Sequence, residues 1–125
     1  MGNFKELRVW SDAIDLATGI YKITKRKPFS SDFGLANQIQ RAAVSIASNI
    51  AEGDERGTNK EAIRFFNISK GSAAEVITQL NIAYRIGYLD EITFRKIEDF
   101  TEKIRASIKK LIKARKGKIE NGRKK

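Results

Sequence analysis

Polar residues in one predicted helix, and in the helix that follows it, are the side chains of this chain best suited to chemistry. Arg41, Ser45, Asn49 and Glu52 follow one another at spacings of three and four residues, and Ser72 and Glu75 lie further along the chain. A guanidinium, hydroxyls and carboxylates in such a row can form ion pairs and hydrogen bonds between packed helices. Catalysis here would lack the usual proton carrier and thiol nucleophile, because the chain has no histidine and no cysteine.

Several classes of catalytic site do not fit this row. Di-iron sites in helical bundles need Glu-x-x-His pairs, and helical ribonucleases that pair an arginine with a later histidine would need it where residues 46–48 are Ile, Ala and Ser. Residues 70–72, Lys-Gly-Ser, lie inside a predicted helix and form no phosphate-binding loop. A carboxylate-only Mg²⁺ site is a minor alternative, because the nearby acids do not cluster on one face. We therefore predict a non-enzymatic protein with no metal and no cofactor.

Four segments have the apolar periodicity of amphipathic helices. Apolar rows with spacings of three and four residues run through residues 7–24, 34–53, 58–86 and 90–112. The chain has only one proline and few alternating β-branched runs, which favours an all-helical fold. Short connections between long helices favour antiparallel neighbours. The predicted fold is an all-α, antiparallel up-down-up-down four-helix bundle over residues 1–114, followed by a basic tail, residues 115–125, that we expect to be disordered.

The second segment, GLANQIQRAAVSIASNIAEG, is predicted to be surrounded by other helices. Its central apolar row consists of Leu35, Ile39, Ala42 and Ile46, and alanines beside this row widen the apolar surface. Alanines and serines at these positions let neighbouring helices approach closely.

Residues with capping chemistry mark the predicted helix ends. Ser31 or Asp32 can cap the second segment, and Gly53 is predicted to end it as a C′ residue. Thr58 and Glu61 form a capping box at the start of the third segment. Gly87 is predicted to end the third segment, and Asp90 is predicted to cap the fourth.

The polar row is predicted to lie at the contact between the second and third helices. If these helices meet at the loop between Gly53 and Thr58, facing positions sum to roughly 112–114. This register places Arg41 near Ser72 and one turn from Glu75. We expect a shielded Arg41–Glu75 ion pair that fixes register or partner choice, with Ser45, Asn49 and Ser72 completing the hydrogen bonds. An ordinary solvent-exposed face is the alternative.

The positive charge is concentrated at the end of the chain. The net charge is +10, yet residues 1–108 hold 16 cations and 14 acids. Residues 109–125, which we call the basic segment, hold one acid and nine cations: Lys109, Lys110, Lys113, Arg115, Lys116, Lys118, Arg123, Lys124 and Lys125. We predict that these side chains bind nucleic acid through its phosphates. A terminus that only improves solubility is the alternative.

Composition and hydropathy give the expected location of the protein. No apolar run approaches the roughly 20 residues needed to span a bilayer, and the first ten residues lack the apolar core of a signal peptide. The basic segment also lacks the apolar residues that an interfacial membrane helix needs. We expect a soluble, cytoplasmic protein without a membrane partner.

Three stretches together carry a resemblance to a known family. FKELRVWSDAIDL, FGLANQIQRAAVSIASNIAEG and FFNISKGSAAEVITQLNIAYRIGYL resemble the bacterial 23S rRNA intervening-sequence proteins, or S23 proteins, over roughly residues 4–112. The resemblance implies a left-handed four-helix bundle that assembles into a ring, typically a pentamer. It also implies that Arg41, Ser45, Asn49, Glu52, Gly71, Ser72 and Glu75 fall on motif positions. No enzymatic activity comes with the family.

The resemblance and the charge pattern together give two predicted functions. The first is an oligomeric nucleic-acid-binding or scaffolding protein, with RNA favoured by the family association and little sequence specificity. The second is an adaptor whose ring surface docks a partner enzyme. A reverse transcriptase is the example implied by a more distant similarity to the accessory variability determinant of diversity-generating retroelements. The accessory proteins are basic over the whole body, whereas residues 1–108 of this chain are close to neutral.

Overall fold

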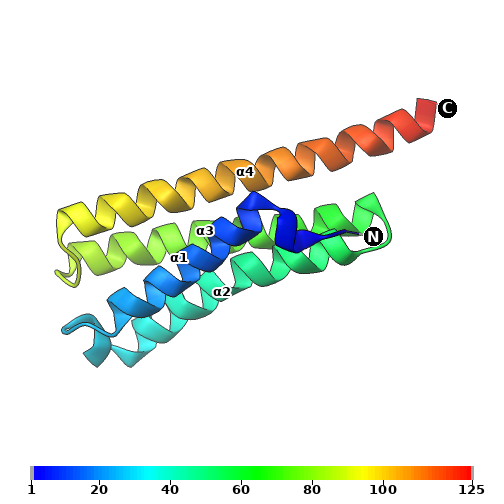
Figure 1. Cartoon of the computed structure of the whole chain (residues 1–125). Helices are drawn as coiled ribbons and strands as arrows, with labels where there is room; N and C mark the ends of the chain where they lie inside the picture. The colour runs from blue at the N-terminus through cyan, green and yellow to red at the C-terminus, as the bar shows by residue number, and fades with distance from the viewer. Residues whose placement is uncertain (1, 125) are drawn as a thin grey trace.

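The computed structural model describes residues 2–124 of the chain, and its regular structure is helical throughout (Figure 1). The elements are η1 (Phe4–Glu6), α1 (Arg8–Thr24), η2 (Phe29–Ser31), α2 (Phe33–Glu55), α3 (Asn59–Arg85) and α4 (Glu91–Lys124). No strand occurs among residues 2–124. The four α-helices form a bundle, which confirms the predicted all-α four-helix fold.

Contacts between α3 and α4 show that these helices run in opposite directions. The Asn81 side chain donates a hydrogen bond to Glu98, and Arg115 donates one to Asn59, so position along α4 rises as position along α3 falls. Figure 1 shows the same reversal at each connection along the chain. In the bundle, α2 packs mainly against α1 and α3, and α4 packs mainly against α3. Helix α4 therefore lies diagonally across the bundle from α2.

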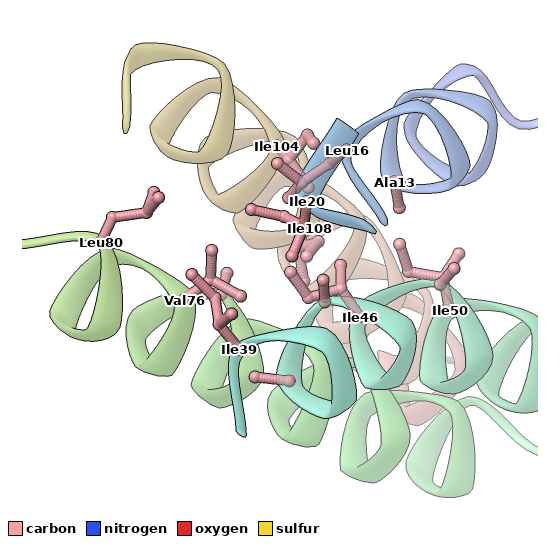
Figure 2. Close-up of a cluster of buried hydrophobic side chains, with 14 of the residues drawn as sticks. Ala13, Leu16, Ile20, Ile39, Ile46, Ile50, Val76, Leu80, Ile104 and Ile108 are labelled. Carbon is pink, nitrogen blue, oxygen red and sulfur yellow. The ribbon is translucent and has the colours of Figure 1, made fainter. Parts of the chain in front are cut away.

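The core lies on the axis of the bundle and is mainly aliphatic, with Phe29, Phe66 and Phe94 also fully buried. Figure 2 shows its central cluster, in which all four helices contribute side chains that point inward. Fully buried members include Ile20 of α1, Ile46 of α2, Leu80 of α3 and Ile108 of α4. Burying side chains of this size stabilises the fold by about 1.5–3 kcal/mol each. Each helix therefore supplies an inward apolar row, as its periodicity in the sequence predicts.

Four of the predicted helix ends are formed by the expected residues. Asp32, Thr58 and Asp90 each accept a hydrogen bond from the backbone amide three residues later. Gly87 follows α3 with a φ of +86°, a left-handed conformation that favours glycine. The amide of Tyr88 then donates to the carbonyl of Ala83, which completes a Schellman motif.

Gly53, in contrast, does not end α2. The helix continues to Glu55, and Gly53 is buried inside its last turns. A Cβ atom added to Gly53 would lie 2.6 Å from Cε1 of Phe66 and 3.0 Å from the carbonyl oxygen of Ala62. This glycine therefore serves close packing of α2 against α3. The prediction that it is a C′ residue was wrong.

The end of α4 also differs from the expectation for the tail. Residues 115–124 continue α4 as a helix, whereas the sequence predicts a disordered tail over residues 115–125. Gly117 and Gly122 each disfavour helix by about 1 kcal/mol relative to alanine, but they stand among lysine, arginine, glutamate and isoleucine, and no proline interrupts them. Lys125 lies outside the described residues, and only the backbone is described for Arg123 and Lys124.

Acidification should weaken the start of α4. The amide of Thr93 donates to Oδ1 of Asp90 at 2.7 Å and its hydroxyl donates to Oδ2 at 3.1 Å, and these bonds lower the pKa of Asp90 below its usual value of 3.8. Because the folded-state pKa is the lower one, the stabilisation is present above about pH 4 and is lost as pH falls through the folded value.

The Asp90→Asn variant tests this prediction, because asparagine caps a helix but does not titrate. Urea unfolding should show a smaller loss of stability between about pH 4 and pH 2 in the variant than in the native chain. An equal loss in both proteins would contradict the prediction.

Candidate functional site

A chain of hydrogen bonds joins α2 to α3 at the middle of the predicted polar row. The hydroxyls of Ser45 and Ser72 lie 2.9 Å apart, and Nδ2 of Asn49 donates to both the carbonyl and the hydroxyl of Ser45, at 2.9 and 3.0 Å. The buried hydroxyl of Ser69 donates to the carbonyl of Ile46 at 2.8 Å. The structure thus brings Ser45, Asn49 and Ser72 together in one hydrogen-bonded group.

The predicted register between α2 and α3 was wrong by about one helical turn. Ser45 faces Ser72, whereas the sequence places Arg41 near Ser72. The reason is the continuation of α2 to Glu55, which moves the connection later in the sequence than a helix ending at Gly53 allows. For a given residue of α2, the facing residue of α3 therefore has a higher number than predicted.

Arg41 and Glu75 line one groove but do not form the predicted ion pair. The groove lies on the outer side of the α2–α3 contact, has a volume of about 290 Å³, and is lined by Gln38, Arg41, Ala42, Ser45, Ser72, Glu75 and Gln79. We call it the polar groove. Both charged side chains are exposed, and within residues 2–124 no Arg41–Glu75 contact of 4.0 Å or less is present. The groove therefore presents one positive and one negative group to a neighbour.

The motif residues Glu52 and Gly71, and the groove residue Gln79, have different surroundings. Glu52 pairs with Arg56 one turn later on the same helix, at 2.8 Å. Gly71 lies in the middle of α3 on its solvent-exposed side, and a Cβ atom built on it meets nothing within 4 Å. The carbonyl-type oxygen of Gln79, Oε1, is buried without a hydrogen-bond partner in the structure.

Most described side chains of the basic segment are exposed, as phosphate binding requires. Lys109, Lys110 and Lys113 are exposed beside the bundle, and Lys116 and Lys118 are exposed further along α4. The structure therefore leaves these five ammonium groups accessible on one long helix.

Arg115 is different, because it is held inside the bundle. Its guanidinium donates to Oδ1 of Asn59 at 3.0 Å and lies 3.4 Å from Oδ1 of Asp54, with side chains only 20% and 10% exposed for Arg115 and Asp54. It also lies over the ring of Phe66, 5.8 Å from the centroid. Arg115 anchors α4 to the α2–α3 turn. Its predicted role in nucleic-acid binding is therefore not supported by its position.

The anchor defines where α4 leaves the bundle. Asp54 and Asn59 lie at the end of α2 and the start of α3, so no helix of the bundle extends past the level of Arg115 except α4. The nine residues 116–124 project beyond it, a length of about 13 Å at 1.5 Å per residue. Figure 1 shows this projecting end in red.

One basic side chain near the segment was missed in the sequence. A groove of about 250 Å³ between α1 and α4 is lined in part by Arg8, Asp12, Lys103 and Lys110. Lys103 lies seven residues before Lys110 and so on the same face of α4, a spacing that could have identified it. The structure thus extends the basic surface from the segment towards α1.

Two general features of the described chain bear on the class of site. Among the described residues, no group of three or more acidic side chains is arranged to hold a metal ion. None of the helices in residues 2–124 has the length and apolar character required to cross a bilayer.

Comparison with known proteins identifies the family. The family model for the 23S rRNA-intervening sequence protein matches residues 5–110. A crystal structure at 1.70 Å of a protein with unknown function from the S23 ribosomal protein family of Bacteroides thetaiotaomicron shares the fold. It has a TM-score of 0.78 and 24% identity, and the match covers 84% of this chain and 98% of that one. No curated protein matches the chain. This chain belongs to the 23S rRNA-intervening sequence protein family.

Proposed function

We propose that this protein is a non-enzymatic homo-oligomer that binds nucleic acid, RNA in preference, through the basic segment of each copy. The observation that carries the proposal is the set of exposed lysines on α4, of which two lie on the part of the helix that projects past Arg115. The preference for RNA rests on the family to which the chain belongs. The bundle then acts as a rigid support for the basic segment.

The physics of this binding is that of phosphate neutralisation. Lysine side chains release counterions from the nucleic-acid backbone, so affinity falls steeply as salt is added. Base-specific recognition of single strands uses aromatic stacking, and the described basic segment contains no aromatic residue. We therefore expect little dependence on sequence.

Association of several copies multiplies this effect. The family resemblance favours a ring, typically of five copies, and a ring presents several basic segments to one polyanion. Once one segment has bound, the others bind at a high effective concentration, which raises avidity without any new type of contact. An oligomer therefore binds a long nucleic acid much more tightly than a short one.

Replacing Lys109, Lys113, Lys116 and Lys118 with glutamine tests the proposal. Glutamine keeps helix propensity but removes four charges. The slope of log affinity against log salt for single-stranded RNA should become shallower by about 3 for each engaged segment, at roughly 0.7 for each phosphate contact. Fluorescence anisotropy with a labelled RNA, titrated at several salt concentrations, measures this slope.

A matched variant separates position from net charge. Lys22, Lys25, Lys27 and Lys96 are exposed lysines outside the basic segment, and replacing them with glutamine removes the same four charges. This control should keep most of its affinity and its salt dependence. Equal losses in the two variants, or no salt-dependent binding by the native chain, would refute the proposed role of the segment.

The polar groove supports a second candidate function. Arg41 and Glu75 line an open groove and form no ion pair with each other, which suits a surface that docks another protein. In this alternative the protein is an adaptor for a partner enzyme, such as a reverse transcriptase, and its charge is incidental. Negligible RNA binding by the native chain and by both lysine variants would favour it.

A further inference from the structure

The exposed apolar side chains are concentrated around α2. Eight large apolar side chains are exposed among residues 2–124, and seven of them lie on α2 or on its neighbours α1 and α3, including the residue after α3: Ile14, Tyr21, Phe33, Val44, Ile68, Ile82 and Ile86. The eighth, Ile92, lies at the start of α4. From Phe33 to Ala51, Arg41 is the only charged residue of α2, in a chain that is 32% charged. Depletion of charge beside exposed apolar groups is the composition of an interface core.

The first of two surfaces lies between α1 and α2. Gln40 of α2 donates to the hydroxyl of Thr24 at 2.9 Å, and this bond identifies the rows of α1 and α2 that adjoin each other. Eight uncharged residues at spacings of three and four from these two anchors line this side, and Lys25 adjoins it beside Phe33: Trp10, Ile14, Ala17, Tyr21, Phe33, Val44, Ala47 and Ala51. We call it the uncharged face.

The second surface lies on the other side of α2. The Ser45–Ser72 hydrogen bond identifies the adjoining rows of α2 and α3, and residues spaced three and four from Ser72 include Ile68, Ile82 and Ile86. We call these three side chains the isoleucine ridge. Glu75 lies between Ile68 and Ile82 on this row, so the ridge is apolar at both ends and polar at its centre.

We propose that a second copy of this chain is the occupant of the uncharged face, and that it docks there with its isoleucine ridge. The inference rests on the proposed oligomer and assigns the surfaces that build it. Each copy then uses two different surfaces, one on each side of α2, so the contact is heterologous. Heterologous contacts close into a ring when the two surfaces are inclined to each other.

The inclination of the two faces suits a small ring. Neighbouring faces of a four-helix bundle meet at about a right angle, and surfaces at about this angle close a ring of roughly four or five copies. Because the faces share α2, this helix is the innermost element of every copy. Helix α4, diagonally opposite, then lies on the outside with its lysines free.

The heights of the side chains along the bundle match across this contact. Copies related by an axis parallel to the helices meet residues at their own level. The Thr24–Gln40 and Ser45–Ser72 bonds fix the relative heights of α1, α2 and α3. From these bonds, Ile14 lies at about the level of Ile68.

The same comparison of heights along the bundle places the other exposed side chains opposite one another. Tyr21 lies at about the level of Glu75, so its hydroxyl can donate to that carboxylate. Phe33 lies at about the level of Ile82 and Ile86. Apolar groups therefore meet apolar groups at both ends, and a polar pair at the centre sets the register, as single polar layers do in coiled coils.

Engineered disulfides test the contact, because the chain contains no cysteine of its own. The pairs Ile14→Cys with Ile68→Cys, and Phe33→Cys with Ile82→Cys, replace exposed side chains at matching levels. A disulfide forms only when the two Cα atoms come within about 7 Å. Light scattering on the native chain first establishes whether it is an oligomer.

Mild oxidation of either double variant should give a ladder of covalent species on a non-reducing gel, ending at the size measured by light scattering. Each single variant should stay uncrosslinked, and a mixture of two matching single variants should give dimers only. The control, Ile14→Cys with Ala106→Cys, places the second thiol on the exposed side of α4 and should give no ladder.

The remaining outcomes would overturn the inference in distinguishable ways. Dimers from Ile14→Cys alone would mean that two uncharged faces meet each other. A native oligomer without a ladder from either double variant would mean that other surfaces build it, and the proposed oligomer would survive. A native chain of 14 kDa in dilute buffer would remove both the contact and the oligomer of the proposed function.

Discussion

The Phe66→Ala variant should lose roughly 3–5 kcal/mol of unfolding free energy, the cost of truncating a fully buried phenylalanine. Phe66 is 1% exposed, lies against Gly53 of α2, and carries the Arg115 guanidinium over its ring. Truncation removes apolar contact area and leaves a cavity where α2, α3 and α4 meet. A domain of this size is typically stable by 5–15 kcal/mol, so the variant should be marginal. Urea denaturation followed by circular dichroism measures the loss.

The neighbouring residue supplies a matched control for this prediction. Phe65 is only half-buried, and its ring lies beneath the Arg56 and Arg64 guanidinium groups at the surface. The Phe65→Ala variant should therefore lose about 1 kcal/mol or less. Both variants must be compared at one protein concentration, because association adds to apparent stability. Equal losses would mean that Phe66 is not a core residue.

The Gly53→Ala variant should be destabilised by about 1–3 kcal/mol, although alanine is the better helix former. The added methyl group would lie 2.6 Å from the Phe66 ring and 3.0 Å from the Ala62 carbonyl oxygen. The ring is buried and the carbonyl belongs to α3, so neither can move without separating the helices. Thermal unfolding should show a melting temperature lower by several degrees.

Gly19 is also a glycine inside an α-helix, but no neighbouring atom restricts the space around it. It lies within α1, and an added Cβ would meet nothing within 4 Å. The Gly19→Ala variant should therefore gain about 0.5–1 kcal/mol from helix propensity alone. If both glycine variants shifted the melting temperature in the same direction, close packing would not be the reason for Gly53.

The fold was predictable because each helix carries its own periodic apolar row. Asp32, Thr58, Gly87 and Asp90 were also identifiable, since a cap depends on residues near it in the sequence. Gly53 was not, because a glycine that permits close packing and one that ends a helix look alike until the partner ring is known. Helix α4 extends past the predicted end of the bundle at residue 114 because the residues around Gly117 and Gly122 favour helix.

The candidate site was predictable only in part. Serine and asparagine spacing brought Ser45, Asn49 and Ser72 together correctly, because these contacts depend on which faces meet. The Arg41–Glu75 ion pair is not formed although the observed register brings the two residues to about the same level, because both side chains are exposed and charges in water gain little from pairing. The sequence grouped Arg115 with the exposed lysines predicted to bind nucleic acid, because charge alone does not distinguish a side chain that anchors a helix from one that binds a ligand. Its position after Ile104, Ile108 and Ile112 on the core row was the available signal.

The placement of the chain ends makes the molecule directional. Gly2 lies against Asp54, and α4 leaves the bundle beside the same turn, so both described ends sit at one pole (Figure 1). A tether attached at either end would hold every molecule with that pole towards a sensor surface. The hairpin loops at Pro28 and Gly87 would then always face the bulk solution. Attachment through the N-terminus and attachment through the C-terminus would therefore present the same surface to an analyte.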